Sequence, residues 1–424
     1  MDIKKIAAQK GMQLFCILFC VLVISCGGNK NKQTVYPVVT GKVLPDWSEG
    51  YLDIHHINTG RGESALYIFP DGTTMLVDAS SSLIAVDHDI PPPPAKPNAA
   101  AISGQTISNY VSHFIKAADN KLNYILITHW HEDHIGGYDT SLPEHSSGKF
   151  SLTGVTQVGA NIWFDKIIDR GYIYPTDISS NDNIVNYIKF VNWAKEEYTA
   201  TTEEFKVGVT DQFALVRNPV KYADFQIRNI FANGIVWTGS GIETRNTFPP
   251  ASGVAEVNPN ENHLCCAFHL KYGLFDYFAG ADLQYNNRSV HAWLDVEAPI
   301  AEVMQPVEVL KANHHGTNHC NSDVFLNKLK SDVIIIPVWR DVQPNPSTIS
   351  RMFDANSECE IFTTNMTEKN KSVLGAETIS RIKALNGHIV VRVAPGGNSY
   401  FVYVLDDTNE NYIVKKIFGP YQCN

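Results

Sequence analysis

The sequence predicts an α/β fold in which two β-sheets pack face to face between outer helices, an αββα sandwich. Short apolar runs bounded by turn residues occur in both halves of the chain, and segments with helical spacing lie between them. Layers of this kind bury the apolar face of both element types. Of the 424 residues, 44% are hydrophobic, which is ample for a large core.

The individual elements follow from these patterns. We predict strands at residues 51–58, 64–69, 75–78, 124–128, 225–234, 264–270, 274–279, 307–310 and 332–337. We predict helices at residues 106–118, 184–198 and 347–354, where apolar residues recur at helical spacing. Residues 388–393 and 400–405 flank a turn that contains Pro-Gly-Gly and are expected to form a hairpin.

One six-residue stretch, His-Trp-His-Glu-Asp-His, carries four candidate metal ligands: His129, His131, Asp133 and His134. It follows the predicted strand 124–128. Because side chains alternate along an extended backbone, His129 and His131 point to the same side and can share one cation. Asp133 and His134 follow where the chain turns and can face a second cation. Imidazole and carboxylate groups suit Zn²⁺ and related metals.

Three further motifs follow predicted strands. They are Leu-Val-Asp-Ala ending near Asp78, Gly-Ala-Asp ending at Asp282, and Asn-His-His-Gly-Thr, which contains His314 and His315. With the histidine cluster, these motifs resemble the metallo-β-lactamase superfamily in content and order. The resemblance spans about residues 50–400 and implies a metal-dependent hydrolase.

The resemblance also implies a site that holds two metal ions, most simply zinc, with manganese or iron as alternatives. One ion would be held by His129, His131 and His263, and the other by Asp133, His134 and His315. Asp282 would bridge the ions, and Asp133 would also orient the attacking hydroxide that they supply. Asp78 and His314 would support the ligands from behind.

Within the superfamily, the chain resembles the metallo-hydrolase domain of bacterial DNA-uptake competence proteins and its stand-alone relatives. Two departures stand out. Gly-Arg-Gly-Glu, which ends at Glu63, replaces the usual Gly-Gln-Gly-Asp, and Asn-Glu-Asn-His replaces the usual Asn-x-Ser. The second departure places His263 where that group lacks an imidazole, so we expect His263 to be a ligand.

This narrower resemblance favours phosphoester chemistry, most simply hydrolysis of a phosphodiester. A lactonase or β-lactamase-like amidase remains an alternative. A second alternative is a lipid-anchored binding protein that has kept the fold without catalysis. The net charge of −10 and the lack of a Lys/Arg block do not support nucleic acid as the substrate, and no protein partner is implied.

The first 26 residues have the pattern of a bacterial lipoprotein signal peptide. Lysines precede a short apolar stretch, and Val-Ile-Ser-Cys ends at Cys26, the expected lipidation site. An uncleaved anchor is the alternative, and either places the hydrolase in the cell envelope outside the cytoplasm. We therefore divide the chain into a signal at 1–26, a polar tether at 27–48 and a hydrolase domain at 49–424.

A long insertion is expected at about residues 138–259, between the histidine cluster and the next motif. Its aromatic residues Trp163, Tyr172 and Tyr174 could stack on a ring or sugar of the substrate, or could fill the core. Five cysteines lie beyond Cys26, and their odd number and irregular spacing do not indicate a disulfide framework. Cys320 is the one near the expected site, as a packing residue or a thiolate ligand.

Overall fold

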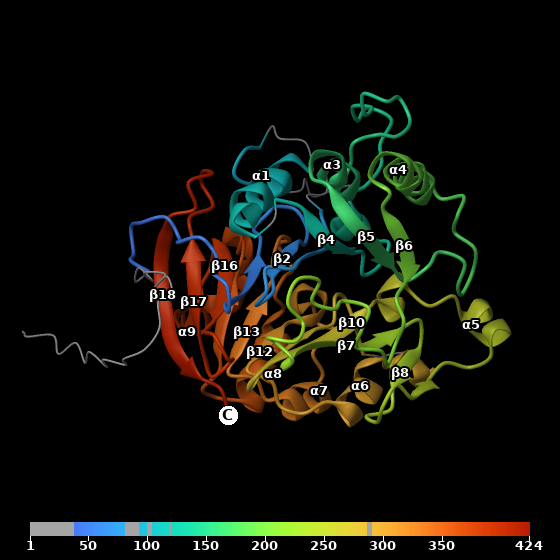
Figure 1. The fold of residues 1–424 in the computed structure, drawn as a ribbon. Coiled ribbons are helices and arrows are strands. Elements are labelled where there is room, and N and C mark those ends of the chain that lie inside the picture. The colour runs from blue at the N-terminus through green and yellow to red at the C-terminus, as the bar shows by residue number, and fades with distance from the viewer. Residues whose placement is uncertain (1–37, 81–92, 100–103, 119, 286–290) are drawn as a thin grey trace, which may run out of the picture. The chain divides into compact units, whose positions relative to one another are not determined.

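The computed structural model describes residues 38–80, 93–99, 104–118, 120–285 and 291–424. Two sheets lie face to face, and helices cover their outer faces (Figure 1), so the predicted αββα sandwich is confirmed. Cys26 and the predicted signal peptide lie outside the described residues. Among the described helices, none combines the length and the apolar character needed to span a bilayer.

The first sheet has the strand order β18-β17-β16-β1-β2-β3-β4-β5-β6. Its strands are β1 (Leu52–His56), β2 (Ala65–Ile68), β3 (Thr74–Val77), β4 (Leu122–Leu126), β5 (Phe164–Asp169), β6 (Thr201–Glu204), β16 (His388–Val393), β17 (Ser399–Leu405) and β18 (Val414–Gln422). The strands from β3 to β6 are parallel, and the remaining pairs are antiparallel. The predicted hairpin is formed by β16 and β17.

The second sheet has the order β15-β14-β13-β12-β11-β10-β7-β8-β9. Its strands are β7 (Phe225–Ala232), β8 (Ile235–Trp237), β9 (Thr244–Asn246), β10 (Ala267–Tyr272), β11 (Phe275–Ala279), β12 (Val309–Lys311), β13 (Val333–Ile336), β14 (Glu360–Thr363) and β15 (Ile382–Ala384). The strands from β11 to β15 are parallel. Each sheet therefore joins an antiparallel part to a parallel part.

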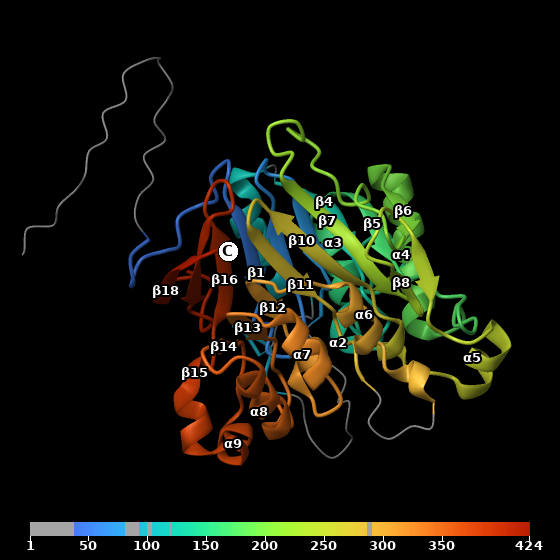
Figure 2. The same cartoon turned by 90° about the horizontal axis from the view of Figure 1, so that it is seen from below.

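Helices form the two outer layers. They are α1 (Gln105–Phe114), α2 (Glu132–Ile135), α3 (Gly154–Asn161), α4 (Asp182–Tyr198), α5 (Ala251–Val257), α6 (Glu297–Val303), α7 (Asp323–Leu329), α8 (Pro346–Ala355) and α9 (Glu368–Arg381). The helices α1, α3 and α4 lie over the first sheet, whereas α6, α7 and α8 lie over the second (Figures 1 and 2). The predicted helices at 106–118, 184–198 and 347–354 correspond to α1, α4 and α8.

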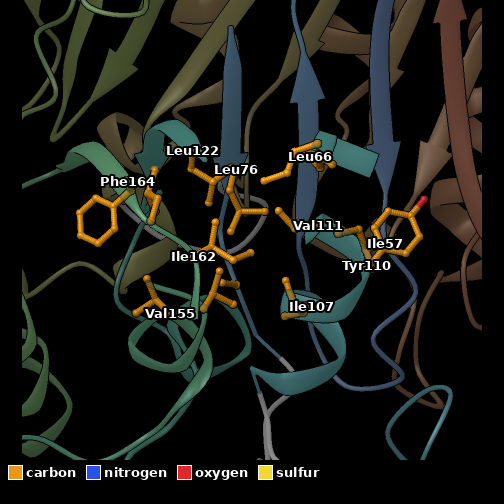
Figure 3. Packing of buried hydrophobic residues seen from close by; sticks show 14 of the residues in the cluster. Ile57, Leu66, Leu76, Ile107, Tyr110, Val111, Leu122, Val155, Ile162 and Phe164 are labelled. Carbon is orange, nitrogen blue, oxygen red and sulfur yellow. The ribbon is translucent and has the colours of Figure 1, made fainter. Parts of the chain in front are cut away.

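The outer face of the first sheet is buried by aliphatic side chains that interlock with α1 and α3. Leu66, Leu76 and Leu122, on neighbouring strands, point at Ile107 and Val111 of α1 (Figure 3). All five are fully buried. Burial of a side chain of this size contributes about 1.5–3 kcal/mol, so this layer fixes α1 on strands β2 to β4.

The layer between the sheets is apolar and rich in aromatic rings. Tyr67 on β2 and Tyr277 on β11 are fully buried, and their hydroxyl oxygens lie 3.0 Å apart. This hydrogen bond satisfies two polar atoms inside the core, where an unpaired hydroxyl would be costly. It also joins the two sheets directly.

The segment at residues 138–259 contributes strands to both sheets. Its first part supplies β5 and β6, which extend the first sheet beyond β4, and its last part supplies β7, β8 and β9 of the second sheet. Trp163 is 52% exposed and stacks on Tyr198 at a ring-centroid distance of 5.1 Å. It precedes β5, at the opposite end of that strand from the metal-binding motifs.

A buried ion pair connects two neighbouring inner strands of the first sheet. Asp53 of β1 and Arg392 of β16 are cross-strand partners, and both guanidinium contacts are short, at 2.8 and 2.6 Å. Burial alone would raise the pKa of Asp53, but the Arg392 charge outweighs burial and lowers that pKa to about 2.

We expect Asp53→Asn to lower the free energy of unfolding by about 3–5 kcal/mol near neutral pH, because Arg392 is left buried without its counter-charge. The folded-state pKa lies below the ordinary value, so this contribution is present above pH 3.8 and is lost as pH falls towards about 2. Urea denaturation across this range should show the two proteins converging. Glu49→Gln, at an exposed pair with Lys221, should have little effect and serves as the control. A gap that does not shrink at low pH would contradict this account.

Candidate metal centre

The metal-binding motifs meet at one edge of the sandwich because parallel strands end there together. Asp78 follows β3 and the histidine cluster follows β4 in the first sheet. Asp282 follows β11 and His315 follows β12 in the second. In open α/β sheets, the carboxyl ends of parallel strands are the usual place for a ligand site.

Asp78 holds the cluster in place from behind. One carboxylate oxygen accepts the Thr128 backbone N–H at 2.8 Å, and the other lies 2.7 Å from Nδ1 of His134. Asp78 is fully buried. With Nδ1 donating to Asp78, Nε2 of His134 is left to face the site, which is how a carboxylate orients a metal-binding imidazole. The structure thus places Asp78 in its expected supporting position.

The first group of clustered donors contains His129, His131 and Asp282, whose candidate ligand atoms all lie within 4.8 Å of one another. Nε2 of His129 and Nδ1 of His131 are 3.2 Å apart. Thr128 contacts the remaining nitrogen of His129, because its hydroxyl lies 3.1 Å from Nδ1. The alternation along the chain thus brings the two imidazoles together, as expected from the sequence.

The second group contains His134, His315, Asp282 and Glu63. Nε2 of His315 lies 3.4 Å from Asp282 and 3.2 Å from Asp133, while its Nδ1 lies 2.7 Å from the Pro337 carbonyl oxygen. The structure therefore brings Asp133 to this group through His315. Asp282 belongs to both groups, which is the position expected of a bridging carboxylate.

A metal ion fits the chemistry of these donors. In the structure, Nε2 of His134, Nε2 of His315 and Oδ1 of Asp282 are buried atoms without a hydrogen-bond partner. Buried polar atoms are nearly always paired, so three such atoms within one cluster of candidate ligands indicate a group that they would bind. Imidazole nitrogen and carboxylate oxygen are ligands of Zn²⁺ and neighbouring metals.

Charges inside the site favour a cation. Asp282 is fully buried, which would raise its pKa, but His315 and His134 outweigh burial and hold that pKa well below its usual range. Burial lowers the pKa of His129, and the neighbouring His134 and His131 lower it further. The site therefore combines an ionised carboxylate with His129, an imidazole that stays neutral, which is the form that binds metal. Although burial opposes it, the Asp282 and Asp78 carboxylates raise the pKa of His134 well above its usual range, so these carboxylates attract positive charge and a metal ion would take the place of that proton.

Four residues at the site adopt the left-handed backbone conformation: Asp78 (φ 54°), Ala281 (φ 49°), His314 (φ 45°) and His315 (φ 51°). Residues other than glycine rarely adopt it, and such positions cluster at functional sites. The pair at 314–315 sharply turns the chain after β12, and both imidazoles lie near Asp282 as a result.

The structure does not bring His263 to either group. It lies in a 3₁₀ helix, Glu261–Leu264, rather than at the start of a strand, because β10 begins only at Ala267. Its Nδ1 lies 3.2 Å from the Asn260 carbonyl oxygen, and its Nε2 lies 2.9 Å from the Gln284 side-chain amide. The Asn260 side chain caps this turn, and the ring contacts Asn260 and Gln284 rather than the clustered donors, in contrast to the expectation from the sequence.

His314 lies nearer to the donors than a purely supporting residue needs to be. Its Nε2 is 3.7 Å from Oδ2 of Asp282. The Asn262 amide nitrogen lies 3.1 Å from the same ring nitrogen. Asn262, rather than the adjacent His263, therefore contacts the site. Burial lowers the pKa of His314 to about 4, although the Asp282 charge opposes this shift.

Two functional features carried no clear signal in the sequence. Glu63, a member of the second group, pairs with buried Lys311 at 2.9 Å and lies 3.6 Å from Nδ1 of His315. Lys311 also donates to the Ala281 carbonyl oxygen at 2.7 Å, beside Asp282. The Gly-Arg-Gly-Glu motif could have indicated Glu63. Cys320 is buried against the Thr317 carbonyl and belongs to neither group.

Two glycines allow the cluster to pack tightly. Gly62 (φ +122°) passes so close to Asp133 that a Cβ would lie 2.5 Å from the Asp133 carbonyl oxygen. Gly136 (φ +81°) ends α2, and a Cβ there would lie 2.0 Å from the Gly154 nitrogen. Any larger residue at either position would displace the loop that carries Asp133 and His134.

Comparisons with known proteins agree with this arrangement. A family model described as the metallo-beta-lactamase superfamily matches residues 58–167, which include Asp78 and the histidine cluster. The resemblance to this superfamily is therefore confirmed, whereas the narrower resemblance to competence proteins is not specifically supported. Together with the clustered donors, the match identifies a metal-dependent hydrolase of the metallo-β-lactamase fold, and the comparisons leave its substrate open.

The solved structures that match the chain share little sequence with it. A metallo hydrolase from Ignicoccus hospitalis, Igni18, is 10% identical with a TM-score of 0.37, over 80% of this chain and 98% of that one. YhfI from Bacillus subtilis is 12% identical with a TM-score of 0.34, over 81% and 100%. A CmlA beta-hydroxylase variant is 12% identical with a TM-score of 0.35, and the chain spans about half of it, 54%, with 81% of its own length. No curated protein matches the chain significantly.

We expect His263→Ser to leave the affinity for both metal ions unchanged, because this ring contacts Asn260 and Gln284 rather than the donors. His314→Ala should weaken the binding of one ion, because its Nε2 faces Asp282. Competition with a chromogenic chelator, together with elemental analysis, measures both affinities. Clear loss of one ion in His263→Ser would restore the expectation from the sequence and contradict the arrangement described.

Proposed function

We propose that this protein is an exported hydrolase of phosphoester bonds, most simply a phosphodiesterase, that uses two zinc ions. The observation that carries the proposal is the position of Asp282, which belongs to two groups of clustered donors at once. A carboxylate shared in this way is suited to bridging a pair of cations. Manganese or iron could occupy the same donors.

Two bound ions would activate a water molecule near neutral pH and stabilise charge on the attacked oxygen. The protein's own residues position this chemistry. His129 and His131 would hold one ion, and His134, His315 and Asp133 the other. The Asp133 carboxylate, 3.2 Å from His315, would also orient the attacking water. No separate Ser or Cys nucleophile is required by this arrangement.

Charge and the neighbouring cavity support a small phosphoester rather than a nucleic acid. The chain has a net charge of −10. A cavity of about 310 Å³ lies beside His131. Among the described residues that line it, Arg170 is the only Lys or Arg, and it is paired with Glu261. A phosphate backbone needs several unpaired Lys or Arg side chains, so one small molecule suits this cavity better.

We expect Asp282→Asn to lower kcat by about a thousandfold while the chain stays folded, because both ions lose a shared anionic ligand. Turnover of p-nitrophenyl phosphodiester, phosphomonoester, lactone and cephalosporin substrates would be followed with metal content by elemental analysis. Asp165→Asn, at a half-buried pair with Lys121 that lies outside the donor groups, is the matched control and should keep full activity. Metal-free protein that retains wild-type turnover would refute the mechanism, and turnover of only the lactone or cephalosporin would favour the alternative enzymes. Absence of turnover with two ions bound would favour the non-catalytic binding protein.

The envelope location is part of the same proposal, and it rests on the lipoprotein-like segment that ends at Cys26. We expect Cys26→Ser to release the protein from the membrane fraction of a bacterial host or to leave its precursor uncleaved. Cys20→Ser, within the same apolar stretch, should leave processing unchanged. Mass spectrometry and fractionation would report both, and unaltered mature mass and membrane association in Cys26→Ser would show that another signal acts.

A further inference from the structure

The cavity beside His131 has an unusual charge arrangement for a site next to a metal centre. Arg170 and Glu261 are the only charged side chains among the described residues that line it, apart from the titratable His131 itself. Thr176, Asn258 and Asn260 add hydroxyl and amide groups near its solvent-exposed side. The cavity is therefore polar, and its fixed charges sum to zero.

Arg170 is committed to other protein groups. Its Nε and Nη2 donate to the two oxygens of Glu261 at 2.5 and 2.7 Å, and its Nη1 donates to the Tyr174 carbonyl oxygen at 2.8 Å. The Arg170 side chain is 1% exposed and that of Glu261 is 15% exposed. A bidentate pair with little exposure is strong and fixed in geometry, so it leaves no unbalanced positive charge for a ligand.

Glu261 also holds the metal-binding loop. Its Oε1 accepts the backbone N–H of Trp130 at 3.0 Å, and Trp130 lies between His129 and His131 in the sequence. The Trp130 indole donates to the Gly171 carbonyl oxygen at 2.9 Å, next to Arg170. The ion pair therefore forms a cavity wall and is tied to the backbone that presents His131.

We propose that this cavity selects the substrate's side group, and that it accepts an uncharged hydrogen-bonding group such as a polyol or an amide. A carboxylate would be attracted by Arg170 but repelled by Glu261. An ammonium group would be attracted by Glu261 but repelled by Arg170. Either charge would lose water without gaining a counter-charge. The inference rests on the proposed function, because it assumes that the phosphoester group binds at the metal donors and places its side group in the adjoining cavity.

Four phosphonates that resist hydrolysis test this selection. They share a three-carbon chain: 3-hydroxypropylphosphonate, propylphosphonate, 2-carboxyethylphosphonate and 3-aminopropylphosphonate. Calorimetry with metal-loaded wild-type protein should show the hydroxyl compound binding most tightly, on the order of tenfold better than either charged compound. The wild-type order alone decides the proposal, so it does not depend on a variant that folds. Tightest binding of the carboxylate or the amine would overturn it.

Glu261→Gln provides the sharper test. Glutamine keeps an oxygen to accept the Trp130 N–H but removes the negative charge, so Arg170 is left unbalanced. The carboxylate compound should gain on the order of tenfold in affinity relative to the hydroxyl compound, with metal content unchanged. Glu49→Gln, at the exposed pair with Lys221, is the control and should leave the order unchanged. An unchanged ratio in folded, metal-loaded Glu261→Gln would overturn the proposal.

The two proposals can fail separately. Selective phosphonate binding without phosphoester turnover would remove the proposed function and keep the selectivity of the cavity. Turnover with no preference among the four side groups would keep the proposed function and remove the selectivity. If metal-loaded protein bound none of the four compounds, both would be overturned.

Discussion

The site depends on one buried hydrogen bond, between Asp78 and Nδ1 of His134. The carboxylate also accepts two donors from Thr128, so it fixes the chain where β4 ends and the histidine cluster begins. With Nδ1 engaged, Nε2 of His134 points at Asp282 from the other sheet. The bond is fully buried, which makes its loss costly and its geometry well defined.

A second buried contact holds the metal donors of the second sheet in place. Lys311, buried beneath the site, joins Glu63 from the first sheet to the Ala281 backbone of the second. This contact crosses the interface between the sheets directly next to Asp282. The metal donors are therefore held from both sides of the sandwich by buried polar groups, and the left-handed backbone at His314 and His315 is stabilised by that framework.

The selectivity that we propose for the substrate's side group belongs to the cavity beside the metal donors. The wall of the adjoining cavity comes from Arg170, which follows β5, and from Glu261, in the turn before β10. The pair is tied to the metal-binding loop at Trp130, so the metal centre and the cavity share one rigid support. The cavity would thus bind a substrate side group close to the metal donors, and that group would not contribute to metal binding.

The sequence alone determined the fold class and most of the donors, because both depend on local patterns. Alternation after a buried strand pairs His129 with His131, and strand-end motifs locate Asp78, Asp282 and His315. Such local patterns can be interpreted without knowing which distant residues are in contact. The helices α1, α4 and α8 were also predicted, with bounds shifted by a few residues at their ends, whereas the other described helices were not.

Only the tertiary structure decided the surroundings of those donors. The Asn260 cap turns the chain into a 3₁₀ helix in which His263 contacts Gln284. The left-handed turn at His314 and His315 brings His314 to Asp282 instead. The pairing of Arg170 with Glu261 joins residues far apart in the chain, and nothing local indicates it. Side-chain direction after a turn, and the neutralisation of one charge by a distant one, depend on which elements pack together, and a single sequence does not encode that locally.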